Sequence, residues 1–311
     1  MTEPVRHDAT PVTPEDPLEG GWPELEHGVA QITDEVALFY VAQGDPAHPL
    51  VVLLHGFPEH WYGWRHQIPA LVEAAYRVVA PDMRGYDRSS KPEAVDDYTP
   101  ERIGDDVAAL LDALGADTAT VIGHDWGGVA AWMFAMRHPT RLAHLLVMNM
   151  PHPAVFARSW KTFRQKLRSF YFYFFRMRGF AAFVYRRFRA LPQRLMLWWF
   201  AKRKPAWRTL DPYATAALRP GAMRAMMTYY TALLARDPDA ILQSATRIEA
   251  PVSVVWGTKD PAFAVELATP GDAMVAPEGF HLERIEGAGH FLHLERPIEV
   301  TAANLRALAR H

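Results

Sequence analysis

The chain of 311 residues contains no cysteine, which excludes disulfide bonds, thiolate metal sites and a cysteine nucleophile. It has no run of 18 consecutive apolar residues, so a membrane span is not expected. Residues 1–23 are rich in proline, glutamate and threonine and lack an apolar core, so we expect no signal peptide. The formal net charge is only −2, which gives no sign of nucleic-acid binding. These absences favour a soluble enzyme with a cytoplasmic location.

Acidic residues are also missing from one long internal segment. Between Asp125 and Asp211 there is no Asp or Glu, whereas 17 of the chain's 33 Lys and Arg residues fall there. Many Phe, Tyr and Trp residues are interleaved with these basic residues. One interpretation is a solvated basic face over an aromatic core. The alternative is a surface that attracts lipophilic anions or contacts an anionic membrane.

Short apolar runs alternate with helical patterns, as in a doubly wound, mostly parallel α/β sheet. We expect strands at residues 31–40, 50–54, 77–80, 118–122, 142–148, 251–256 and 282–286, and helices at 68–74, 100–114, 127–137 and 297–310. From about residue 151 to residue 241 the pattern is helical and rich in aromatic residues. We therefore predict an N-terminal extension (1–24), an α/β core (25–150 and 245–311) and an inserted helical lid, or cap (151–244). The active site of such a sheet lies beyond the carboxyl ends of its strands.

One short motif carries the chemistry. Residues 121–128, Val-Ile-Gly-His-Asp-Trp-Gly-Gly, have the strand, sharp turn and helix pattern that presents a nucleophile at the turn. The central residue is Asp125, where ordinary esterases have serine. Serine needs a base to remove its proton, whereas aspartate is ionised at neutral pH and attacks an electrophilic carbon directly. The expected product of that attack is an alkyl ester, formed at a strained or activated sp3 carbon such as that of an epoxide or an alkyl halide.

Two later residues complete a hydrolytic set in the order nucleophile, acid, base. Asp260 follows the predicted strand that ends at Trp256, and His290 lies in a glycine-flanked loop after the last predicted strand. The imidazole would take a proton from the water that attacks the ester on Asp125, while Asp260 fixes its tautomer and stabilises the imidazolium. Either residue alone also fits a structural role in its loop. The order of all three favours catalysis.

The segment His55-Gly56-Phe57-Pro58 follows the predicted strand 50–54. Backbone N–H groups of Phe57 and Trp126 would hold the negative oxygen that forms when water adds to the ester carbonyl. Aiming the Phe57 amide requires an unusual bend, which a cis Phe57–Pro58 peptide bond suits. A simple turn at the end of the strand is the alternative interpretation.

With these residues in view, the chain resembles the epoxide hydrolases of the α/β-hydrolase fold over most of residues 25–305. The segments that carry the resemblance are His55-Gly56-Phe57-Pro58-Glu59 with Trp61 and Trp64, Pro81-Asp82-Met83-Arg84-Gly85-Tyr86, Gly123-His124-Asp125-Trp126-Gly127-Gly128, and Gly287-Ala288-Gly289-His290. The resemblance implies the α/β-hydrolase fold, hydrolysis of a small lipophilic epoxide to a vicinal diol, and substrate contacts from Phe57, Trp61 and Trp126. No metal or organic cofactor is expected, because every charge in the reaction has a protein partner. The oligomeric state is open, with a homodimer as one option.

Members of that family use two lid tyrosines to hydrogen-bond the epoxide oxygen. The resemblance assigns these roles to Tyr171 and Tyr230. Tyr173 and Tyr229 are the neighbours to test, because on a helix only one residue of an adjacent pair can point into the cleft.

The sequence departs from the family's pattern at Asp87, where a glycine is usual, although aspartate tolerates a positive φ better than most residues. A haloalkane dehalogenase is the alternative function, since it shares the aspartate nucleophile and Trp126 could bind a halide. Phe57 in place of asparagine, together with the lid tyrosines, favours an epoxide. A non-catalytic binding protein of the same fold is a third class, which the complete catalytic set disfavours.

Overall fold

A computed structural model of the chain describes residues 25–160 and 171–310, with only the backbone of Tyr171, Tyr173, Phe174 and Ser244. The predicted N-terminal extension and part of the predicted lid therefore lie outside the described residues.

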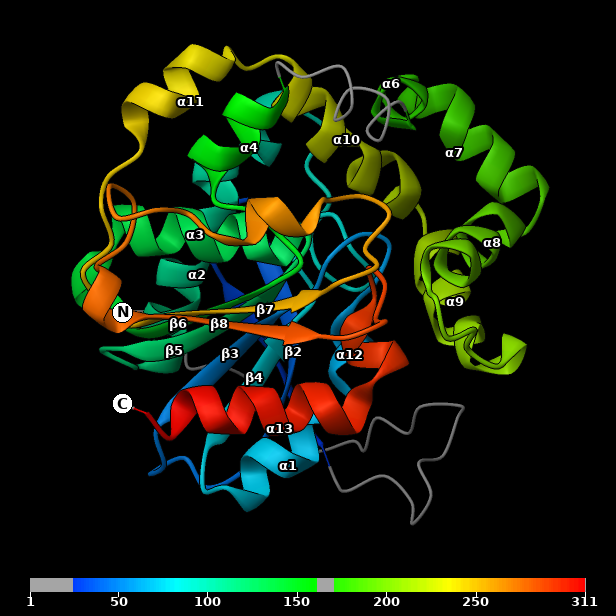
Figure 1. Cartoon of the computed structure of the whole chain (residues 1–311). Coiled ribbons are helices and arrows are strands. Elements are labelled where there is room, and N and C mark those ends of the chain that lie inside the picture. The colour runs from blue at the N-terminus through cyan, green and yellow to red at the C-terminus, as the bar shows by residue number, and fades with distance from the viewer. Residues whose placement is uncertain (1–24, 161–170, 311) are drawn as a thin grey trace.

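Eight strands of the described chain form one sheet at the centre of the molecule (Figure 1). Their order is β1-β2-β4-β3-β5-β6-β7-β8; β2 is antiparallel to β1 and β4, and the other neighbours are parallel. The strands are β1 (Glu26–Gln31), β2 (Ala37–Gln43), β3 (Leu50–Leu54), β4 (Arg77–Pro81), β5 (Ala119–His124), β6 (Leu142–Met148), β7 (Val252–Gly257) and β8 (Phe280–Ile285). The mostly parallel, doubly wound α/β fold predicted from the sequence is thus confirmed.

Helices cover both faces of the sheet. In Figure 1, α1 (Gln67–Glu73) and α13 (Pro297–Leu308) lie on one face, and α2 (Pro100–Leu114) and α3 (Trp126–Arg137) lie on the other. Side chains that alternate along a strand supply both cores. On β3, Val52 and Leu54 belong to the core under α2 and α3, whereas Val51 and Leu53 belong to the core under α1 and α13. Short helices occupy the connections, namely η1 (Trp61–Trp64), η2 (Val95–Tyr98), η3 (Pro139–Arg141), η5 (Val265–Ala268), η6 (Pro277–Gly279) and α12 (Leu292–Glu295).

Between β6 and β7 the chain leaves the sheet and forms a set of helices, called the lid below. They are α4 (Pro153–Trp160), α6 (Tyr171–Arg176), α7 (Arg178–Arg187), α8 (Leu191–Phe200), η4 (Trp207–Leu210), α9 (Asp211–Leu218), α10 (Ala222–Leu234) and α11 (Pro238–Ser244). In Figure 1, α7, α8 and α9 lie on the side towards which β7 and β8 point. These three lid helices therefore lie beyond the carboxyl ends of β7 and β8.

The predicted strand over residues 31–40 is correct only from Ala37 onward, where β2 begins. The structure has a hairpin of β1 and β2 there, with a turn in which Thr33 Oγ1 accepts hydrogen bonds from the backbone N–H groups of Glu35 and Val36. β1 is an edge strand in which buried and exposed residues alternate, so it lacks the apolar run that marks the central strands.

None of the described helices combines the length and the hydropathy that a bilayer span requires.

Candidate active site

Asp125 occupies the sharp turn between β5 and α3. Its φ of 49° and ψ of −119° place it in a strained conformation that presents its side chain beyond the strand. Two glycines make the turn possible. A Cβ atom at Gly127 would lie 2.0 Å from the carbonyl oxygen of Leu54, and one at Gly123 would lie 2.3 Å from that of Gly127. The glycine spacing of the motif is therefore a requirement of close backbone packing.

The structure brings the three predicted catalytic residues together. His290 Nδ1 lies 2.9 Å from Asp260 Oδ2, and His290 Nε2 lies 3.5 Å from Asp125 Oδ2. All three side chains are buried. Asp260 is itself held by the backbone N–H groups of Ala262 and Phe263, which donate to its Oδ1. One imidazole thus bridges the carboxylates of Asp125 and Asp260 from opposite sides of its ring.

The other oxygen of the Asp125 carboxylate accepts a hydrogen bond from the backbone. The Phe57 N–H group donates a hydrogen bond of 2.8 Å to Asp125 Oδ1. The Phe57–Pro58 peptide bond is cis, as predicted. A Cβ at Gly56 would lie only 2.5 Å from that of Asp125, so glycine at this position lets the strand end approach the carboxylate. Trp126, the other predicted donor, begins α3, where first-turn N–H groups lack helical partners.

The charges around His290 favour its protonated form. Burial opposes an imidazolium here, but the carboxylates of Asp260 and Asp125 outweigh it and raise the pKa of His290 well above its ordinary value. The site therefore favours an imidazolium between two carboxylates.

Sequence reasoning missed the residues that fix the loop carrying His290. Asn149 Nδ2 donates to the carbonyl oxygens of Gly289 and His290 at 2.8 and 2.9 Å. His124 Nε2 also lies 2.9 Å from the His290 carbonyl oxygen. Since a carbonyl only accepts, that nitrogen carries a proton. Two features of the sequence could have indicated these residues. Asn149 directly follows an apolar strand, and His124 directly precedes Asp125.

His124 is held in turn by Glu59. Glu59 Oε2 lies 3.0 Å from His124 Nδ1, and Glu59 Oε1 lies 2.9 Å from His293 Nε2. Burial opposes the charge of Glu59, but His293 and His124 outweigh that effect and lower its pKa well below the ordinary value. The three side chains could coordinate a cation by type, but both carboxylate oxygens already have histidine partners, so they form a hydrogen-bonded support for the loop.

The adjacent tyrosines of α10 have different surroundings. The Tyr229 hydroxyl donates a hydrogen bond of 2.7 Å to the carbonyl oxygen of Arg84. The Tyr230 ring lies 5.3 Å from the rings of both Phe57 and Trp126, beside the nucleophile. This arrangement favours Tyr230 as the residue that reaches a substrate. Tyr171 and Tyr173 fall in α6, but their side chains lie outside the described residues, so their assignment stays a prediction.

Trp61 is placed differently from the other predicted substrate contacts. Its ring packs edge-on against His60 and Tyr62, and it belongs to the core under α1 and α13. Phe57, Trp126 and Tyr230 belong to the other core. The structure thus brings Phe57 and Trp126 to the nucleophile but not Trp61, whose substrate contact stays a prediction.

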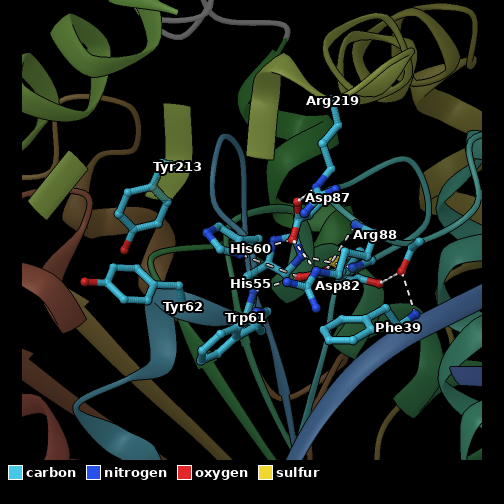
Figure 2. Close-up of polar contacts among 12 residues, drawn as sticks. Phe39, His55, His60, Trp61, Tyr62, Asp82, Asp87, Arg88, Tyr213 and Arg219 are labelled. Carbon is cyan, nitrogen blue, oxygen red and sulfur yellow. Dashed lines mark hydrogen bonds and ion pairs between the residues drawn. The ribbon is translucent and has the colours of Figure 1, made fainter. Parts of the chain in front are cut away.

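A second polar cluster, shown in Figure 2, links the core to the lid. His60 Nδ1 lies 3.9 Å from Asp82 Oδ1 and from Asp87 Oδ2. Arg219, between α9 and α10, forms an ion pair with Asp87 Oδ1. The backbone of Asp87 has a positive φ of 29°, a conformation that aspartate tolerates. Burial lowers the pKa of His60 to about 4, so the ring is neutral at pH 7. His60, Asp82 and Asp87 could ligate a metal by type, but Arg219 and Arg88 already place positive charge beside them, which disfavours a divalent cation.

Comparisons with known proteins agree with this geometry. The profile of the alpha/beta hydrolase fold family matches residues 49–297. The AB hydrolase superfamily protein YfhM of Bacillus subtilis is 35% identical over 282 residues, covering 89% of this chain and 96% of that protein. Epoxide hydrolase A of Mycobacterium tuberculosis is 35% identical over 308 residues, covering 89% of this chain and 95% of that protein. An epoxide hydrolase from Bacillus megaterium, solved with its diol product, superposes with a TM-score of 0.79 at 25% identity, covering 90% of this chain and 99% of that one.

The fold and the site define an α/β hydrolase with aspartate in place of the usual serine. The chain belongs to the α/β-hydrolase fold family and, within it, to the epoxide hydrolases.

Proposed function

We propose that this chain hydrolyses epoxides to vicinal diols through a covalent ester on Asp125. The observation that carries the proposal is that the two carboxylate oxygens of Asp125 have different partners. Oδ1 accepts the Phe57 N–H, while Oδ2 faces His290 Nε2. The names of the relatives support an epoxide as the substrate.

In the first half-reaction, Asp125 Oδ2 attacks the less hindered epoxide carbon and the ring C–O bond breaks. The departing oxygen takes a proton from Tyr230 or Tyr171, because an alkoxide is too basic to leave unprotonated. Oδ1 stays at the Phe57 amide and becomes the carbonyl oxygen of the ester.

Proton balance assigns a second role to His290. The tyrosine recovers its proton from the His290 imidazolium, either directly or through water. Esterification removes the charge of Asp125, one of the two carboxylates that raise the pKa of His290. The ring that was an acid in the resting enzyme is thereby ready to act as a base.

In the second half-reaction, His290 removes a proton from water, which attacks the Asp125 carbonyl carbon. The oxyanion forms at the Phe57 and Trp126 amides, and Asp260 stabilises the new imidazolium. When the C–O bond of the ester breaks, the hydroxyl proton of the intermediate passes to the diol oxygen. Asp125 is again a carboxylate and His290 is again protonated, so the cycle closes.

A single-turnover reaction in 18O-labelled water tests this mechanism. With enzyme in excess, the diol should carry unlabelled oxygen from Asp125, and peptide mass analysis should find the label in the Asp125 peptide. Label in the diol of the first turnover would mean that water opens the ring directly. Asp125→Ala should abolish turnover, which excludes a contaminating activity.

A substrate panel separates the epoxide from the halide alternative. Purified protein should convert styrene oxide or a trans-disubstituted epoxy fatty acid and release no bromide from 1-bromobutane. Dehalogenation without epoxide turnover would assign the same nucleophile to haloalkanes.

A further inference from the structure

The exposed apolar side chains of this protein gather on the lid. Twelve large apolar residues of the described chain are exposed, and ten of them lie between Met177 and Leu218. Trp199 is 72% exposed, Phe183 63% and Phe188 54%. The remaining two, Val29 and Ile298, lie apart on the core. Exposed large apolar side chains that gather in one segment indicate an interaction site.

The apolar residues of α8 follow the period of the helix. Leu191, Leu195, Trp198 and Trp199 occupy one exposed stripe, whereas Gln193 and Leu197 face inward. Gln193 anchors the inward face, because its Nε2 donates to the carbonyl oxygens of Pro58 and Tyr213. The helix is thus fixed to the protein by a polar side chain and presents its apolar stripe to solvent.

Basic side chains surround this stripe. Arg186, Arg187 and Arg189 at the end of α7 and Lys202, Arg203 and Arg208 after α8 are exposed, and the described residues give none of these six an ion pair. The Lys204 ammonium lies 4.4 Å from the centre of the Trp198 ring. The segment holds no carboxylate before Asp211, which pairs with Arg194. Exposed aromatic and basic side chains are therefore interleaved along a segment that carries no acidic residue.

We infer that α7, α8 and the residues up to Trp207 form a docking surface for an anionic lipid bilayer. Exposed aromatic rings insert at the headgroup level, while the basic residues contact lipid phosphates. A second copy of the chain would bring the same carboxylate-free surface against itself in a two-fold dimer, so like charges would oppose that pairing. In Figure 1, α7 and α8 form the outer edge of the lid, where a flat surface can reach them.

Vesicle flotation of the full-length protein tests this inference. The protein should float with vesicles of equal parts phosphatidylcholine and phosphatidylglycerol but not with pure phosphatidylcholine, and about 0.5 M NaCl should release it. Phe183→Ser with Trp199→Ser should weaken binding at least about tenfold. Arg186→Glu with Arg189→Glu should abolish binding to the anionic vesicles.

Matched variants on the core provide the controls. Val29→Ser with Ile298→Ser removes the two large apolar side chains that, among the described residues, are exposed outside the lid, and it should leave vesicle binding unchanged. All variants should hydrolyse a water-soluble epoxide at the wild-type rate, so a failure of the proposed chemistry is distinguishable from a failure of docking. Absence of binding to either vesicle, or equal binding by the lid variants, would overturn the inference. So would a dimer that the lid variants dissociate, since it would identify a second copy as the occupant.

Discussion

The side-chain amide of Asn149 donates a hydrogen bond of 2.9 Å to the backbone carbonyl oxygen of His290. The same nitrogen reaches the carbonyl oxygen of Gly289, and the side-chain oxygen accepts the Gly257 N–H at 2.8 Å. Asn149 follows β6 directly and has a φ of 45°. One buried side chain therefore ties the ends of β6 and β7 to the loop that carries the predicted base.

Replacing Asn149 should slow ester hydrolysis more than ester formation. Asn149→Asp keeps the size and the acceptor for Gly257 but cannot donate to the two carbonyl groups. A loop displaced by a fraction of an ångström should lower kcat up to about 100-fold, and the Asp125 ester should accumulate in rapid-quench samples. Asn149→Ala should show the same pattern and cost about 1 to 3 kcal/mol of unfolding free energy, since it leaves the partners of the amide unsatisfied. A wild-type kcat without ester accumulation in Asn149→Asp would show that the loop does not need this anchor.

The pKa of His290 should fall when Asp125 loses its charge. In the resting enzyme the two carboxylates hold it well above the ordinary value, so NMR titration of wild-type protein should find His290 still protonated above pH 7. Asp125→Asn should shift the titration to lower pH, as esterification does in the proposed cycle. His55 serves as an internal control, because burial lowers its pKa to about 4 and its signal should stay constant near neutral pH in both proteins.

The same shift has consequences for activity and stability. Because the imidazolium supplies a proton in the first half-reaction, kcat/KM should decline as pH rises through the pKa of His290. The folded-state pKa of His290 lies above the unfolded value of about 6.5. Protonation of His290 therefore adds to the free energy of unfolding, and this contribution is fully present below the unfolded value. This contribution is lost as pH rises through the folded-state pKa. A kcat/KM that increases through that range would contradict the proton balance.

Two adjacent tyrosines offer a matched pair of variants. Tyr230→Phe should lower kcat/KM for styrene oxide about 100-fold, since it removes a donor from the leaving oxygen. Tyr229→Phe removes the hydrogen bond to Arg84 and should cost about 1 kcal/mol of unfolding free energy while kcat/KM changes little. The opposite pattern would move the assignment to Tyr229.

The sequence predicted the sheet and the residues that meet at its edge, Asp125, Asp260 and His290, because both depend on local patterns. Apolar runs, and glycines at fixed offsets, identified the turn at Asp125, and chain order selected Asp260 and His290. The supports of the site were not predictable in this way. Asn149 is separated from His290 by 141 positions and His124 by 166, and nothing in either local sequence indicates the partner.

The lid shows a second limit of sequence patterns. A helical period shows that a stripe exists but does not say which stripe is buried. The expectation of an aromatic core is met at Phe172 and Phe175, which pack on Tyr230. It is wrong at Phe183 and Trp199, which face solvent. The difference depends on tertiary contacts such as those of Gln193, which determine how α8 is rotated.

The ion pair between Asp87 and Arg219 should couple the core to the lid energetically. Arg219→Ala leaves Asp87 beside Asp82 with only the more distant Arg88 as a cation and should cost about 1 to 2 kcal/mol, a moderate value because the Arg219 side chain is 40% exposed. Asp87→Gly should cost less, since glycine adopts the positive φ at this position without strain. Urea unfolding of both single variants and the double variant should give a coupling free energy of about 1 kcal/mol between Asp87 and Arg219. Arg137→Ala is the control, because Arg137 forms an exposed ion pair with Asp105, and it should change stability by less than about 0.5 kcal/mol. Additive effects at Asp87 and Arg219 would show that the contact does not hold the lid, and the usual glycine could then replace Asp87 without consequence.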